Sequence, residues 1–305
     1  MRKETKGYLL VILGASFLGT IGIFARLIYR QEPDPLTVVT FRALVAFLFL
    51  FLVAVFVNPD WLRITRRDFL FFGVYGLLSV SLCFLLFFYA IKYTTVATAT
   101  VLLYTSPAFV ILLSRLFLGE EFTRHKILAL LLTFLGCILV IQVYSPAGLR
   151  FNLRGVVYGL GAGLGAGLYS IFGKRGVGKY NSFTVVTYAL GFGSFFLLLV
   201  RRVHTLVAVS YPPQTWLWIF ALALLSTVLG YSLYTRGLRY LEAGRAGIAA
   251  TWEIVVASFL AFVIFGEKLN ALQIIGAVLI LVGIVIIKTQ PSKEETQKNP
   301  AGADS

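Results

Sequence analysis

The carboxylate of Glu253 is the group in this sequence whose position most strongly indicates chemistry. It follows Trp252 inside an apolar segment that covers residues 243–265. In a helix, Glu253 would lie roughly 13 Å from the start of that segment, at 1.5 Å per residue. A carboxylate inside a membrane costs at least about 2.5 kcal/mol, so it requires a cavity, a partner or a proton. We expect Glu253 to bind a substrate amine or to carry a proton; a structural hydrogen bond to a neighbouring helix is the alternative.

Three further residues are candidates for the same site. Tyr104 and Trp252 lie deep in their apolar segments, too deep for the aromatic belts that mark a lipid interface. Because an aromatic face can hold a cationic amine, both are predicted to contact substrate. Arg42 lies about two turns from the start of its segment. It could bind a substrate carboxylate or pair with Glu253, or its side chain could reach out to the membrane surface.

A Gly-Glu pair ends two of the apolar segments, at Gly119-Glu120 and at Gly266-Glu267. A carboxylate at the C-terminus of a helix is electrostatically unfavourable, so each glutamate should meet a partner across a loop. We expect a gating or structural role for Glu120 and Glu267 rather than direct contact with substrate.

Four glycines, Gly155, Gly159, Gly163 and Gly167, recur every four residues. Small residues at this spacing let a second helix approach closely, so the stripe predicts helix packing. The same run satisfies a G-x-G-x-x-G search. It has no preceding strand and no soluble βαβ unit, and we therefore exclude nucleotide binding.

The composition indicates an integral membrane protein. Of the 305 residues, 59% are hydrophobic and 13% are charged, whereas a soluble domain has about a quarter charged. Apolar segments of about 20 residues can each cross a bilayer. Ten such segments are found, near residues 8–29, 36–57, 69–91, 95–118, 124–144, 154–173, 182–200, 214–235, 243–265 and 270–288. We therefore predict an all-α fold of ten transmembrane helices, followed by a polar, disordered cytoplasmic tail over 291–305.

The distribution of Lys and Arg predicts the orientation. An even number of helices places both termini on one side, where the loops carry 17 Lys and Arg against 8 in the opposite loops. The positive-inside rule then places both termini in the cytoplasm of a cell-membrane protein. The net charge of +14 is spread over these short clusters and forms no single patch. We therefore expect no nucleic-acid partner.

The two halves of the chain resemble each other. A shift of 147 positions aligns Tyr93 with Tyr240 and the two Gly-Glu pairs without a gap, and a looser match aligns Ile23-Phe24 with Ile171-Phe172. We therefore divide the chain into repeats over 1–147 and 148–290. Because each repeat has five helices, the second must be inverted relative to the first. Transporters commonly have this architecture, with the substrate site near the midplane between the halves.

Two stretches carry a family resemblance: AIKYTTVATATVLLYTSPAFVILLSRLFLGEEF over 90–122 and GLRYLEAGRAGIAATWEIVVASFLAFVIFGEKL over 237–269. With an arginine early in the second helix, they resemble the paired repeats of the EamA family of drug/metabolite transporters. The resemblance implies a carrier for amino acids, amines, carboxylates or drugs, often working as an exporter. The ninth helix departs from the family's frequent Leu-Glu-Pro, because here it reads Trp252-Glu253-Ile254.

Other functions fit the sequence less well. Cys83 and Cys137 lie in apolar stretches, His125 and His204 fall in predicted loops, and no aspartate lies inside a predicted helix. We therefore expect neither an intramembrane enzyme nor a metal or cofactor site. A nucleotide-sugar or phosphate-ester carrier is the alternative transporter, but it would require several cations besides Arg42. The expected partners are a small-molecule solute and membrane lipid, with the proton as a candidate coupling ion.

The orientation can be tested with single cysteine probes in intact cells. A membrane-impermeant reagent added outside should label probes at Ala147 and Val207, which lie in the predicted exterior loops. Probes at Thr65 and Lys179 should be labelled only after the cells are opened. Labelling of Thr65 or Lys179 in intact cells would contradict the predicted topology.

Overall fold

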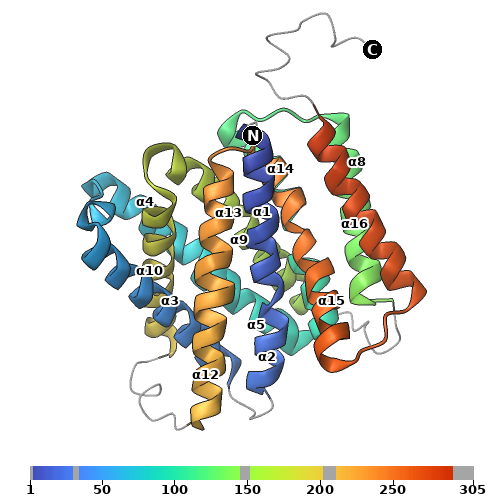
Figure 1. The fold of residues 1–305 in the computed structure, drawn as a ribbon, viewed down its shortest axis with the longest axis horizontal. Coiled ribbons are helices and arrows are strands. Elements are labelled where there is room, and N and C mark those ends of the chain that lie inside the picture. Colours follow the sequence, from blue (N-terminus) through green and yellow to red (C-terminus); the bar gives the residue numbers. More distant parts are fainter. Residues whose placement is uncertain (1–2, 30–33, 145–151, 202–210, 291–305) are drawn as a thin grey trace, which may run out of the picture.

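Ten helical spans make up the structure, a computed structural model that describes residues 3–29, 34–144, 152–201 and 211–290. Within these ranges the spans are long and apolar enough to cross a membrane, and no strand occurs (Figure 1). The predictions of an all-α fold and of ten spans are confirmed.

Several spans consist of more than one helix. The first five spans are α1 and α2 (Lys3–Gly19 and Ile21–Tyr29), α3 (Pro35–Val57), α4 and α5 around a π-helical segment (Arg66–Gly76, Leu77–Leu82 and Cys83–Tyr93), α6 and α7 (Val96–Leu103 and Ser106–Leu118) and α8 (Arg124–Ile141). The last five are α9 (Leu153–Lys179), α10 (Ser182–Arg201), α12 and α13 around a second π-helical segment (Pro213–Ala221, Leu222–Leu229 and Gly230–Leu238), α14 and α15 (Ala243–Ala250 and Trp252–Phe265) and α16 (Ala271–Thr289).

The predicted segments agree with these spans to within a few residues, and most differences are extensions into polar sequence. The prediction that His125 lies in a loop was wrong. It is the second residue of α8, because the Thr123 side chain accepts a hydrogen bond from Lys126 N and starts the helix there. His204, the repeat boundary at 147/148 and the tail over 291–305 lie outside the described residues.

Local side-chain and backbone signals explain where the helices start and end. The side chain of Thr95 accepts from Thr98 N at the start of α6, and Asn270 forms a reciprocal capping pair with Gln273 at the start of α16. Gly119 and Gly266 end α7 and α15 with φ of 66° and 68°. This left-handed conformation suits glycine and closes a helix C-terminus.

The structure shows local correspondences between the halves. The two π-helical segments lie in the third and eighth spans, and the fourth and ninth spans are interrupted at Tyr104-Thr105 and at Thr251. The helix pairs also correspond, since α1 packs on α13 as α9 packs on α5. These features agree with an inverted repeat, which stays a prediction until the halves are superposed.

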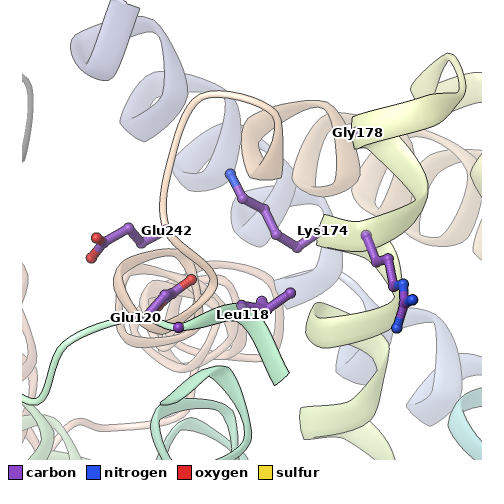
Figure 2. A pocket seen from close by; sticks show the side chains of 7 residues that line it. Leu118, Glu120, Lys174, Gly178 and Glu242 are labelled. Atoms are coloured by element: carbon purple, nitrogen blue, oxygen red, sulfur yellow. The ribbon is translucent and has the colours of Figure 1, made fainter. Parts of the chain in front are cut away.

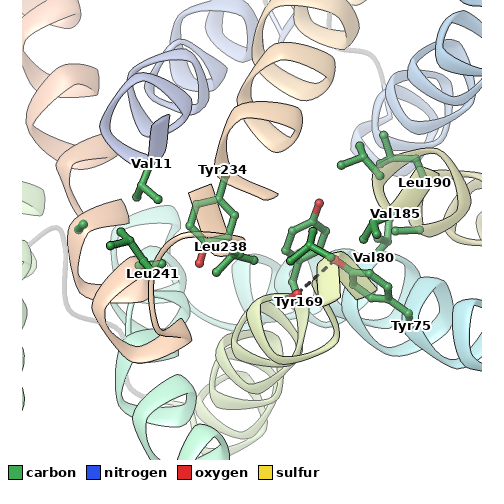
Figure 3. Packing of buried hydrophobic residues seen from close by; sticks show 14 of the residues in the cluster. Val11, Tyr75, Val80, Tyr169, Val185, Leu190, Tyr234, Leu238 and Leu241 are labelled. Atoms are coloured by element: carbon green, nitrogen blue, oxygen red, sulfur yellow. Dashed lines mark hydrogen bonds between the residues drawn. The ribbon is translucent and has the colours of Figure 1, made fainter. Parts of the chain in front are cut away.

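The ends of the described chain lie together at one end of the molecule, which we call the terminal end; the opposite end is the far end (Figure 1). The Tyr8 hydroxyl in α1 donates to the Ile287 carbonyl in α16 at 2.9 Å. The interior between the ends is apolar and contains a few polar links. One of them is the Tyr75 hydroxyl, which donates to the Tyr169 carbonyl at 3.2 Å (Figure 3).

The glycine stripe of α9 packs as predicted. A Cβ at Gly159 would lie 2.6 Å from Leu102 Cδ1, and one at Gly163 would lie 2.8 Å from the Leu102 carbonyl oxygen. These distances are too short for any larger residue, so the stripe sets the separation of the fourth and sixth spans. On the outer surface, large apolar side chains such as Phe56 and Leu70 are exposed and face the lipid.

Candidate functional site

The interruption of the ninth span places Glu253 at the start of a helix. The Thr251 hydroxyl donates to the Ile248 carbonyl at 2.7 Å, and α15 begins at the next residue, Trp252. Glu253 therefore lies in the first turn of α15, where the helix dipole favours a negative charge. The fourth span has the corresponding interruption, and there Tyr104 caps the end of α6.

Glu253, Trp252 and Tyr104 are close together in the structure. The Glu253 carboxylate interacts with the Tyr104 side chain. The Trp252 indole Nε1 donates to the Ser16 hydroxyl in α1 at 3.0 Å. The rings of Tyr104 and Trp252 also pack on the apolar cluster formed by Cys137, Val140, Ile254, Ile280 and Ile284. The structure thus brings Tyr104 next to Glu253 and packs the Tyr104 and Trp252 rings on one cluster.

Arg42 lies in the interior. Its side chain is buried, at 7% exposure, so the alternative in which it reaches the membrane surface is wrong. Its Nε donates to Thr227 Oγ1 in the eighth span at 2.6 Å, and its guanidinium carbon lies 5.4 Å from the centre of the Phe84 ring. Among the described residues, its Nη2 nitrogen has no hydrogen-bond partner. One donor of a buried cation is therefore available.

Tyr231 lies within electrostatic range of both Arg42 and Glu253. Arg42 and Glu253 act on each other electrostatically without forming an ion pair. The central site therefore has a carboxylate beside the Tyr104 ring and an arginine beside the Thr227 hydroxyl.

At the terminal end, Glu120 binds the start of α14. Its carboxylate accepts from Ala243 N at 2.5 Å and from Gly244 N at 3.0 Å. Lys126 lies 3.4 Å from Glu120 and 2.9 Å from Glu242, and its side chain is 1% exposed. The prediction that Glu120 meets a partner across a loop is confirmed.

Two further cations complete this terminal cluster. Arg245 is buried and pairs with Glu242 at 3.4 Å and with Glu4 at 3.3 Å. The Lys174 ammonium donates to the carbonyl oxygens of Leu238 and Leu241, each at 2.7 Å. A cavity of about 370 Å³ opens beside Lys174 and Glu242 (Figure 2). It is lined by Leu118, Gly119, Glu120, Lys174, Arg175, Gly178 and Glu242.

The sequence analysis gave no role to Lys126, Lys174, Glu242 or Arg245. The sequence contained one signal for Lys174. Lys174 is the second residue after Ile171-Phe172, just as Arg26 is the second residue after Ile23-Phe24. The other contacts join residues that are far apart in sequence and have no common motif.

At the far end, Glu267 forms an ion pair with Arg26. Its side chain is 49% exposed and that of Arg26 is 51% exposed. The Arg26 guanidinium carbon also lies 4.3 Å from the centre of the Phe265 ring. Glu267 thus meets a partner from another span, as predicted, but in a far more open setting than Glu120. No group of three or more His, Cys, Asp and Glu that could hold a metal ion occurs among the described residues.

The family model of the EamA-like transporter family matches the chain twice, over residues 5–142 and 153–289. The chain belongs to the EamA-like transporter family. The predicted resemblance is confirmed. The two matches lie one in each half of this EamA-like protein.

The curated relatives are named as transporters. The chain is 31% identical to an uncharacterized transporter of Archaeoglobus fulgidus, over 90% of this chain and 94% of the relative. It is 28% identical to the uncharacterized inner membrane transporter YicL of Salmonella typhimurium, over 94% and 96%. It is 26% identical to the pseudopaline exporter CntI of Pseudomonas aeruginosa, over 82% and 84%. With ten apolar spans, this EamA-like protein is a multi-pass transporter of the plasma membrane.

A solved crystal structure has the same fold. It matches this EamA-like protein with a TM-score of 0.80 at 15% identity, over 92% of this chain and 96% of that chain. At this identity the likeness supports the fold alone.

Lys126→Met tests whether the terminal cluster stabilises the fold. The substitution keeps a long side chain but removes the buried cation next to Glu120 and Glu242. We expect the free energy of unfolding to fall by about 3–5 kcal/mol, because a buried charge is left without its partner. Denaturant unfolding in detergent, followed by tryptophan fluorescence, measures this.

Arg63→Met is the matched control. It breaks the pair of Arg63 with Asp60, whose side chains are 83% and 67% exposed. Such a pair contributes little, so stability should stay nearly unchanged. Equal losses in both variants would contradict the role given to Lys126.

Proposed function

We propose that this protein is a secondary active transporter that exports small metabolites carrying an amine, above all zwitterions such as amino acids. Glu253 binds the amine, the rings of Trp252 and Tyr104 enclose it, and Arg42 binds the carboxylate. The solute reaches this midplane site from either side in turn, by alternating access between the two halves. Membership of the EamA-like family supports transport, and the geometry of the central site supports the substrate class.

The observation that carries the proposal is the state of Arg42. A buried guanidinium normally has all its donors satisfied, because an unpaired polar group in an apolar medium costs free energy. Here Nε is bonded to Thr227 whereas Nη2 is unpaired among the described residues. Arginine presents its donors as a fork that matches a carboxylate. A substrate carboxylate would supply the missing acceptor.

The balance of charge favours a zwitterion over a phosphate ester. A phosphate group brings up to two negative charges, and near Arg42 it would also meet the negative charge of Glu253. A solute with one amine and one carboxylate places each charge opposite its complement. The two aromatic rings next to Glu253 strengthen the binding of the cationic end.

The relatives and the charge distribution support the direction and the orientation. CntI is named as an exporter, and we extend export to this chain. The excess of Lys and Arg in the loops at the terminal end supports a cytoplasmic location of both termini. Glu253 is also the proposed proton carrier, because it is a carboxylate deep in a span that can exchange a proton for the substrate amine.

Glu253→Gln tests the coupling in proteoliposomes. The amide keeps the shape and a hydrogen-bond acceptor for Tyr104, but it has no charge and does not titrate. We expect the protein to fold and insert normally but to lose transport against a gradient. Asp60→Asn, which removes a carboxylate whose side chain is 67% exposed, is the control and should behave as wild type. Wild-type gradients in Glu253→Gln, across a range of external pH, would refute the proposal.

Arg42→Gln tests the substrate class. The assay compares amino acids with the amines that result from their decarboxylation, using the ratio of their kcat/KM values. Wild type should prefer the amino acids, and the variant should lose about tenfold to hundredfold of that preference, the value of a charged hydrogen bond. Transport of the amines themselves should persist in the variant. An unchanged ratio of kcat/KM values would show that Arg42 does not bind the substrate carboxylate.

A further inference from the structure

The terminal end contains a clamp around one turn. The turn over residues 239–242 joins α13 to α14. On its α13 side, Lys174 donates to the carbonyl oxygens of Leu238 and Leu241. On its α14 side, Glu120 accepts the amide hydrogens of Ala243 and Gly244. A cation thus satisfies a helix C-terminus and an anion satisfies the next N-terminus, and both contacts match the helix dipoles.

The far end contains the same pair of residue types at corresponding sequence positions. The 147-residue shift relates Glu120 to Glu267, and the match of Ile23-Phe24 with Ile171-Phe172 relates Lys174 to Arg26. Gly119 and Gly266, which precede the two glutamates, share the left-handed conformation. α7 and α15 therefore end with the same backbone conformation, directly before Glu120 and Glu267.

The contacts at the two ends differ. By the same shift, the turn that corresponds to 239–242 joins α5 to α6 and contains Thr94 and Thr95. There the side chain of Thr95 accepts from Thr98 N, and Arg26 and Glu267 pair with each other. The far-end residues thus form an exposed ion pair, whereas Lys174 and Glu120 hold the backbone of a turn.

The packing of the two ends differs in the same sense. Every residue from Ala243 to Ala249 of α14 is buried, and α14 packs against α7. In the described structure the corresponding helices, α6 and α15, make no extensive contact. Val96, the counterpart of the fully buried Ala243, is 63% exposed. The fourth and ninth spans are therefore closed against each other at the terminal end and apart at the far end.

We propose that Glu267 and Arg26 form the clamp that closes the far end in the opposite state of the transport cycle. In that state Glu267 accepts from the amides of Val96 and Ala97, and Arg26 donates to the carbonyl oxygens of Ile91 and Thr94. Glu120 and Lys174 then release the terminal turn. Only one clamp is closed at a time, which makes the four side chains positioning residues of transport. This inference rests on the alternating access of the proposed function.

Two cysteine pairs report the two states. A Cβ at Gly247 would lie 3.4 Å from Val110 Cβ, close to the separation in a disulfide, roughly 3.5–4.5 Å. Val110→Cys with Gly247→Cys thus reports closure of the terminal end. The corresponding pair, Thr100→Cys with Ala257→Cys, reports closure of the far end. Both are built in a full-length background with Cys83→Ser and Cys137→Ala, and the rate of oxidative cross-linking is measured in proteoliposomes without solute.

Removing a clamp should shift the balance between the states. Glu267→Ala should slow cross-linking of the far pair about threefold to thirtyfold, as the loss of a helix cap would. Glu120→Ala should slow the terminal pair and accelerate the far pair. Asp60→Ala, which removes a carboxylate whose side chain is 67% exposed, is the control and should change neither rate. The Glu267 variant tests the proposal even where Glu120→Ala impairs folding, because Glu267 is half-exposed and stabilises no buried cluster.

Two results would overturn the clamp proposal. One is a rate for the far pair that Glu267→Ala leaves unchanged; the other is a far pair that never cross-links in a protein that transports. The readout needs no solute and is therefore independent of the substrate class. If the cross-linking rates shift as expected but the protein transports no zwitterion, the clamps are supported and the proposed substrate is refuted. If the protein transports zwitterions but the cross-linking rates do not shift, the substrate is supported and the clamps are refuted.

Discussion

Backbone groups cannot remain without hydrogen-bond partners inside a hydrocarbon layer, and this constraint applies at the interruptions of the first, fourth and ninth spans. Three threonines illustrate it. Thr20, Thr105 and Thr251 each donate a hydroxyl hydrogen to the carbonyl oxygen three residues earlier, at 2.6, 2.6 and 2.7 Å. Each of these carbonyl oxygens also accepts the backbone N–H of the same threonine. The first, fourth and ninth spans are therefore interrupted inside the membrane without leaving those carbonyl oxygens unpaired. Ser16, Tyr104 and Glu253 lie beside these interruptions, so the central site follows from them.

The same constraint applies to charged side chains, and it separates the two charged regions. At the terminal end, Lys126 and Arg245 are almost fully buried, and each forms ion pairs with carboxylates. In that region both cations have carboxylate partners, as buried charges in protein interiors normally do. Arg42 is also buried, but it bonds through Nε to a neutral threonine and keeps Nη2 unpaired among the described residues. A buried cation that the protein leaves incompletely satisfied is suited to bind a ligand, whereas the terminal cluster is suited to hold helices together.

The sequence allowed the spans and part of the site to be predicted, for a physical reason. The cost of polar groups in lipid leaves a direct record in hydropathy, so ten spans could be counted and Glu253 stood out against its surroundings. Depth within a span then selected Tyr104 and Trp252. For Arg42, depth within the span did not decide between the interior and the membrane surface, because a long side chain near a helix end can extend toward either. The contacts of Lys126, Lys174 and Arg245 depend on how distant loops meet, and the hydropathy of one span contains no information about that.

The glycine face of α9 has a consequence for the synthesis of the protein in the cell. Its partners are Thr94, Leu102, Thr105 and Phe109, and all of them precede α9 in the chain. A ribosome therefore releases the receiving surface before the glycine-rich span emerges. This order suits a helix that gains little from its own side chains, because glycine is a weak helix former. The sixth span can pack against the fourth span, which is already inserted in the bilayer. The second half can therefore assemble against the first half.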